Sequence, residues 1–292
     1  MLGAGVVLAF PVAAATQVVG YAVSNTESAR TLYRIDFATG EATAIGPTGS
    51  SKVEGLALSP AGELFGINPA TSQLLRCSTE TGGCTVVGTL TGVAPSLAGN
   101  AGLGFASDGR LYAAMNAGLF RVDPTSGSAS FVGNTGIAVG GLAGISPQAN
   151  CPSGLYALGS NTDRGRLFCL NTANGSATLL ATLAGMSPVD GGLDGFADGA
   201  LLYGVADNGS SASQVFEVAA DKLVPENIRR VTAGGVDVTG LESLAVMRVA
   251  SIAPASTDPH AVPTVSAANL SVLALALIAL AAALSARRRG RG

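Results

Sequence analysis

Two short apolar runs separated by a polar turn recur along the chain. The turns read DFATG or DPTSG, where the Asp can cap the turn through its side chain and the Gly supplies the positive φ that closes a hairpin. This pattern predicts one β-hairpin per copy. The clear copies are residues 31–47, 73–89, 118–134 and 166–182, and a degenerate copy begins at 215–218 and ends near 231.

A second predicted hairpin precedes most of these copies. Its segments, such as GLALSPAGELFGI and GLGFASDGRLYAA, are residues 55–67, 102–114, 141–158 and 192–205. Each unit therefore has four strands, and a period of about 40–47 residues with four antiparallel strands is typical of a β-propeller blade. The pattern predicts an all-β propeller over residues 16–250.

The two ends of the repeat region predict how the propeller closes. Residues 17–23 match only the second strand of a unit, whereas ESLAV at 242–246 matches the first strand EGLAL at 54–58. A C-terminal strand that completes the N-terminal blade would leave no open edge. We therefore predict five four-stranded blades. A six-bladed alternative would need a blade within 183–241, which is only moderately longer than one unit.

The first 15 residues, MLGAGVVLAFPVAAA, are apolar and end in an A-x-A-like cleavage pattern. They predict a signal peptide over residues 1–15. The stretch lacks the usual Lys or Arg near its start, which leaves open whether the N-terminus is complete. A buried first strand is the alternative.

The last 42 residues predict a membrane-sorting tail. Residues 251–269 are rich in Pro and small polar residues, which is typical of a linker. Residues 270–286 carry no charge and are just long enough for a transmembrane helix. The basic tail 287–292, with Arg287, Arg288 and Arg289, would stay in the cytoplasm by the positive-inside rule.

The residues before this apolar stretch, Val262, Pro263, Thr264, Val265 and Ser266, form a recognisable motif. With the apolar stretch and the arginines, they resemble the IPTL-CTERM sorting domain, a relative of the PEP-CTERM tails. Ala267 and Ala268 stand where that family commonly has Glu and Trp. The resemblance implies an exported bacterial protein of the cell envelope, processed by an exosortase-like membrane protease. A plain C-terminal membrane anchor is the alternative.

The amino-acid composition limits which binding and catalytic functions the chain can perform. Charged residues make up 12% of the chain, and the basic residues cluster only at the C-terminus, so we expect no nucleic-acid binding. The single histidine, His260, lies in the predicted linker, which excludes a histidine-based triad in the propeller. In an exported protein the four cysteines predict two disulfides, Cys77 with Cys84 across a hairpin and Cys151 with Cys169. A zinc site is the less favoured alternative.

Carboxylates are the remaining candidates for a site. Glu54 and Glu242 hold the same repeat position at the start of an innermost strand, and Asp194 shares it in an ambiguous alignment. Such a position lies near the mouth of the central channel, where three oxygens could bind a hard cation such as Ca²⁺. Solvated strand-end acids are the alternative.

Phrases such as LYRIDFATGEATAIG resemble secreted propellers of the NHL, lactonase-like and related types. The resemblance covers most of the chain between the two ends, but it concerns strands and turns rather than activity. The favoured hypothesis is a non-catalytic surface or matrix protein that binds glycans or proteins. A metal-dependent hydrolase or lactonase, with the cation held by Glu54, Glu242 and Asp194, is the second hypothesis. A receptor-like module tethered by an uncleaved tail is the third.

Overall fold

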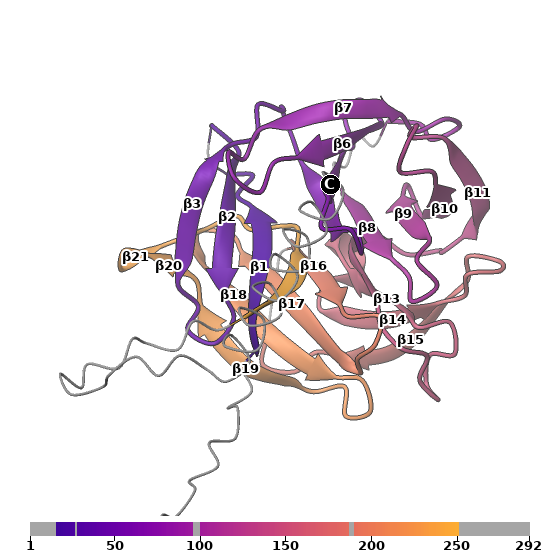
Figure 1. Ribbon diagram of the computed structural model, residues 1–292. Helices are drawn as coiled ribbons and strands as arrows, with labels where there is room; N and C mark the ends of the chain where they lie inside the picture. Colours follow the sequence, from indigo (N-terminus) through magenta and orange to yellow (C-terminus); the bar gives the residue numbers. More distant parts are fainter. Residues whose placement is uncertain (1–15, 27, 96–99, 187–189, 251–292) are drawn as a thin grey trace, which may run out of the picture. The chain divides into compact units, whose positions relative to one another are not determined.

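The computed structural model describes residues 16–26, 28–95, 100–186 and 190–250. Within these ranges the chain folds into five four-stranded antiparallel sheets and one small hairpin (Figure 1). The predicted signal peptide, linker, sorting motif, transmembrane helix and basic tail lie outside the described residues. Within the described ranges, no helix has the length and apolar character needed to cross a membrane.

Each sheet is one blade, in which the strands follow one another from the innermost to the outermost. Blade 1 contains β22 (Ala245–Ala250), β1 (Thr16–Val23), β2 (Thr31–Asp36) and β3 (Ala42–Pro47). Blade 2 contains β4 (Glu54–Leu58), β5 (Leu64–Asn68), β6 (Gln73–Cys77) and β7 (Cys84–Thr89). Blade 3 contains β8 (Ala101–Phe105), β9 (Leu111–Met115), β10 (Gly118–Val122) and β11 (Ala129–Asn134).

The last two blades follow the same order. Blade 4 contains β12 (Val139–Gly144), β13 (Leu155–Gly159), β14 (Arg166–Leu170) and β15 (Ala177–Thr182), with the short 3₁₀ turn η1 (Asn161–Asp163) after β13. Blade 5 contains β16 (Asp190–Gly195), β17 (Leu201–Asn208), β18 (Ser211–Ala219) and β19 (Pro225–Arg230). The small hairpin β20 (Thr232–Ala233) and β21 (Val236–Asp237) follows blade 5.

Blade 1 closes the ring as the sequence predicts. Strand β22 pairs antiparallel with β1, so that Ala245 lies opposite Tyr21 and Ala250 opposite Thr16. Each innermost strand contacts the innermost strands of both neighbouring blades, including β22 with β4. The regular ladder begins at Ala245 rather than at residue 242, and before it Leu241 forms an isolated antiparallel bridge with Ser24.

The six-bladed alternative is wrong. The extra length between blade 4 and the closing strand goes into long strands β17 and β18 and into the β20–β21 hairpin. Longer strands add residues to a blade without adding a sheet.

Neighbouring blades contact each other at their outer rim through glycine. In blades 1 to 3, the glycine near the end of the outermost strand lies against the turn of the next blade, so closely that a Cβ would overlap a backbone oxygen. A Cβ on Gly133 would lie 1.8 Å from the oxygen of Asn174, and one on Gly88 would lie 2.0 Å from that of Ser126. The repeated glycines of the sequence therefore set the spacing between blades as well as the turns.

The core consists of apolar clusters between adjacent blades. The second strand of every blade carries an aromatic residue at one repeat position, and all five side chains are buried: Tyr21, Phe65, Tyr112, Tyr156 and Tyr203. The burial of a large aromatic side chain at this position in every blade makes the hydrophobic effect the main force that holds the blades together.

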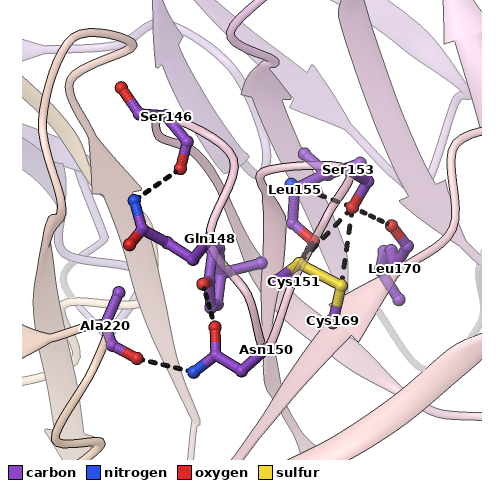
Figure 2. Close-up of a disulfide and its surroundings, with 10 residues drawn as sticks. Ser146, Gln148, Asn150, Cys151, Ser153, Leu155, Cys169, Leu170 and Ala220 are labelled. Carbon is purple, nitrogen blue, oxygen red and sulfur yellow. Dashed lines mark hydrogen bonds between the residues drawn. A yellow bond between two sulfur atoms is a disulfide. The ribbon is translucent and has the colours of Figure 1, made fainter.

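All four cysteines lie in the described ranges and form the two predicted disulfides. Cys77 stands directly opposite Cys84 in the β6–β7 register. Cys151 bonds Cys169 and ties the long loop between β12 and β13 to β14 (Figure 2). The zinc alternative is therefore wrong.

The loop that Cys151 anchors also reaches blade 5. The side chain of Asn150 donates to the carbonyl of Ala220 at 2.6 Å (Figure 2). It also accepts from the Tyr156 hydroxyl at 2.9 Å. The disulfide thus fixes a loop that links two blades.

Candidate functional site

A cluster of polar side chains gathers where the innermost strands begin. We call it the acidic cluster, and it comprises Asn25, Lys52, Glu54, Asn100, Asp190 and Glu242. These residues come from blades 1, 2, 3 and 5 and meet because the innermost strands of a propeller all run in the same direction along its axis.

Asn25 joins the two glutamates at the centre of the cluster. Its amide nitrogen Nδ2 lies 3.1 Å from Glu54 Oε1 and 3.0 Å from Glu242 Oε2, and it also lies 3.0 Å from the carbonyl of Val53. The ammonium of Lys52 forms an ion pair with Glu54 Oε1 at 2.9 Å. Nitrogen donors of the protein therefore contact one oxygen of each carboxyl group, Glu54 Oε1 and Glu242 Oε2.

Two acceptor atoms in this cluster have no donor. Glu54 is 1% exposed, and its Oε2 has no hydrogen-bond partner among the described residues; the same holds for Oδ1 of Asn25. A buried acceptor without a donor costs about 1–3 kcal/mol. Such atoms favour a ligand that supplies hydrogen-bond donors or a positive charge.

The protonation of the cluster reflects its burial. Burial raises the pKa of Glu54 well above its ordinary value, and the neighbouring carboxyl group of Glu242 raises it further, while Lys52 opposes the shift. Burial lowers the pKa of Lys52, but the carboxylate of Glu54 outweighs this effect and the pKa is raised overall. Glu54 therefore retains its proton more readily than a solvent-exposed carboxyl group would.

Asp190 extends the cluster towards blades 3 and 4. It accepts hydrogen bonds from the Asn100 side chain and, at 2.8 Å, from the backbone of Gly191. The pKa of Asp190 is raised to about 7, mainly by burial. The Gly191 hydrogen bond opposes this shift and the charge of Glu242 adds to it. Gly140 makes room for this carboxyl group, because a Cβ there would lie 2.3 Å from Asp190 Oδ1.

Of the three residues predicted to share a cation, the structure brings two together. Glu54 and Glu242 both contact Asn25, whereas Asp194 lines a pocket at the opposite end of the innermost strands, beside Leu58. Glu54 begins β4 and Leu58 ends it, so Asp194 is separated from the acidic cluster by the length of a strand.

Sequence reasoning missed Asn25, Lys52, Asn100 and Asp190. A signal for Asp190 exists in the repeat. In the strand registers, Ala57, Asp194 and Ala245 each lie opposite the repeated aromatic residue. The leucine that directly precedes each of them therefore occupies the same position of the repeat. Counting back from those leucines, the acid stands two residues earlier in blades 2 and 1 and three residues earlier in blade 5, at Asp190.

The cluster is a poor match for a calcium site. Ca²⁺ takes six to eight oxygen ligands, but the Lys52 ammonium and the Asn25 amide nitrogen already contact Glu54 Oε1. In the part of the chain that the structure describes, no group of three or more His, Cys, Asp or Glu side chains is arranged to hold a metal. The arrangement is better suited to accept hydrogen bonds from a polar ligand.

No known protein family and no curated protein matches the sequence. A chain from the crystal structure of a nidogen–laminin complex is 14% identical, with a TM-score of 0.48 over 80% of this chain and 98% of that chain. A protein described as a gluconolactonase is 18% identical, with a TM-score of 0.44 over 78% and 80% of the two chains. A gluconolactonase from Xanthomonas campestris is 14% identical, with a TM-score of 0.43 over 79% and 86%. At these values the similarity carries no information about activity or ligand.

Proposed function

We propose that this chain is an exported protein of the bacterial cell envelope whose propeller is a non-catalytic binding platform for a surface glycan or protein. The observation that carries the proposal is a pair of buried oxygen atoms, Glu54 Oε2 and Asn25 Oδ1, that have no hydrogen-bond partner among the described residues. Sugar hydroxyls, or the amide and ammonium groups of a protein, are donors that would satisfy them.

The experiment is a glycan array and a pull-down with the full chain, repeated with Glu54→Gln. Gln keeps an oxygen for Lys52 and Asn25 but puts an NH₂ donor where the unpartnered oxygen stands. We expect a retained ligand to lose at least about tenfold in affinity, since a lost buried hydrogen bond costs about 1.4 kcal/mol or more.

Asp123→Asn is the matched control, because Asp123 caps an exposed turn between β10 and β11. It should leave binding unchanged. Equal binding by the wild type and Glu54→Gln would contradict the proposed site.

The sequence of the tail supports the proposed location. The motif Val262–Ser266 and the apolar stretch 270–286 would anchor the chain in the membrane until an exosortase-like protease processes it. Mass spectrometry of mature protein from cells tests this. Protein without residues 270–292 supports sorting and release, and an intact tail supports a permanently tethered receptor-like module instead.

A metal-dependent hydrolase or lactonase is the second candidate, and the proximity of Glu54 and Glu242 favours it. Calorimetric titration with Ca²⁺ separates the two. Binding that disappears in Glu54→Ala, together with lactone hydrolysis, would favour the hydrolase over the binding platform.

A further inference from the structure

A pocket of about 570 Å³ lies at the end of the axis opposite the acidic cluster. We call it the axial pocket. All five blades line it, including Leu58 and Phe105 from blades 2 and 3, Asp194 and Phe196 from blade 5, and Met247 from blade 1. Its volume falls in the range of about 300–1,000 Å³ that is usual for small-molecule sites, and its walls are mainly apolar.

Asp194 in this pocket departs from the repeat. The strand registers place it opposite Tyr203, as the equivalent residues stand opposite the repeated aromatic residue in each of the other blades. Those equivalents are Ala57, Gly104, Ala143 and Ala245. A carboxyl group is therefore not needed to build a blade at this position, and its presence in blade 5 calls for another reason.

The carboxyl group of Asp194 is buried without a cation. The residue is 7% exposed, and Oδ2 accepts the backbone N–H of Val246 at 2.7 Å. Burial raises its pKa to about 7, and the hydrogen bonds from Val246 and Gly195 lower it only in part. No lysine or arginine of the described chain forms an ion pair with it. A buried carboxylate is stable when a positive charge accompanies it.

The other charged groups in the pocket neutralise each other. Arg248 donates to both carboxylate oxygens of Asp198 at 2.8 Å, and its guanidinium lies 4.0 Å from the centre of the Phe196 ring. When Asp194 is ionised, the pocket therefore carries one net negative charge, at Asp194. The apolar surface of Phe105 and Met247 faces the same space.

We propose that the axial pocket binds a small amphipathic amine, with its ammonium group paired to Asp194 and its apolar body against Phe105 and Met247. The ammonium supplies the charge that the buried carboxylate lacks, and the apolar body fills the walls. An aromatic ring beside a cation adds a cation–π contribution. The inference does not rest on the proposed function, which concerns the opposite end of the axis.

Three indole compounds of similar shape test the charge preference: tryptamine (amine), tryptophol (alcohol) and indole-3-acetate (carboxylate). Isothermal titration of the full chain at pH 8 should give tryptamine at least about tenfold tighter binding than tryptophol, and no binding of indole-3-acetate. Tryptamine affinity should fall at least about tenfold at pH 5, where Asp194 is protonated while the amine stays charged.

Asp194→Asn should abolish both the amine preference and the pH dependence, while its amide oxygen can still accept from Val246 and preserve the fold. Phe105→Ala should weaken tryptamine and tryptophol alike. Asp123→Asn, in the exposed turn between β10 and β11, is the control and should change neither. Equal binding of the three compounds, absence of binding by all three, or an amine preference that survives in Asp194→Asn would overturn the proposal.

Discussion

Replacing Gly133 by Ala tests whether backbone contact between blades depends on glycine. Gly133 lies in outermost strand β11, against the turn that joins β14 and β15 in the next blade. Its φ is not positive, so alanine meets no backbone restriction there. Any loss of stability must therefore come from the space that a Cβ occupies.

That space is already filled. The added Cβ would lie 1.8 Å from the carbonyl oxygen of Asn174. The reverse contact is also too short, since a Cβ on Gly175 would lie 2.5 Å from the carbonyl carbon of Gly133. A strand and a turn whose backbones are in contact cannot absorb this overlap by rotating a side chain. Overpacking of this kind costs about 1–3 kcal/mol. Alanine also lowers the conformational entropy of the unfolded chain, which stabilises the folded state by about 0.4–1 kcal/mol.

We expect Gly133→Ala to lower the free energy of unfolding by about 1–2 kcal/mol. For a domain of this size that corresponds to a Tm lower by roughly 2–8 °C. Urea unfolding and a thermal melt followed by circular dichroism measure both quantities.

Gly83→Ala is the matched control. Gly83 directly precedes outermost strand β7 and likewise has no positive φ, but the nearest atom to its added Cβ is Thr81 Oγ1 at 3.7 Å. This variant should be as stable as the wild type or slightly more so. If Gly133→Ala and Gly83→Ala melt together, the contact between blades is not rigid and the reasoning fails.

Three further outcomes follow from the same structure. Because the pKa of Asp194 is about 7 when folded and near 3.8 when unfolded, the folded protein binds this proton more tightly. The contribution of Asp194 to stability is therefore fully present below about pH 4 and is lost, by up to about 4 kcal/mol, as the pH rises through 7. Urea unfolding at several pH values should show a shallower dependence of stability on pH in Asp194→Asn. Replacing Cys151 and its partner by Ala should cost about 3 kcal/mol and replacing Cys77 and its partner about 2 kcal/mol, since the closed loops differ in length (sequence separations of 18 and 7); equal losses in urea unfolding would contradict this ranking. A chain without 245–250 leaves β1 as an open edge, so its thermal transition by circular dichroism should broaden relative to a chain that ends at residue 250, and an unchanged transition would show that closure contributes little.

The fold could be predicted from the sequence because each blade repeats the same local chemistry. Turn phrases such as DFATG fix hairpins through contacts within a few residues, as the Asp36 side chain does by accepting the N–H of Ala38 at 2.8 Å. The split of one unit between the two ends of the repeat then predicted the β22–β1 pairing. Both inferences use only patterns that can be recognised within short segments of the sequence.

The acidic cluster was only half predictable, for a physical reason. Glu54 and Glu242 follow the repeat, so comparing units found them. Asn25 and Lys52 lie outside the innermost strands. The packing of blade 1 against blade 2 brings Asn25 to Glu54, 29 positions away, and the closure of the ring brings it to Glu242, 217 positions away. Side chains that meet across a ring leave no local pattern in a single sequence.

Comparison of the repeat units placed Asp194 in the wrong cluster, but with the strand registers known the same comparison shows that Asp194 is unusual at its position. Its expected place beside Glu54 assumed that the acid of blade 5 keeps the register of the others, but Asp190 is the acid at that end. Once the registers are known, the same residue stands where the other blades carry Ala or Gly, which is a departure that the fold does not require. Residues that follow the repeat build the blades, and residues that break it at a buried position are where this propeller can hold a ligand. On that argument the buried carboxyl group of Asp194, more than any repeated residue, distinguishes this chain from a bare scaffold.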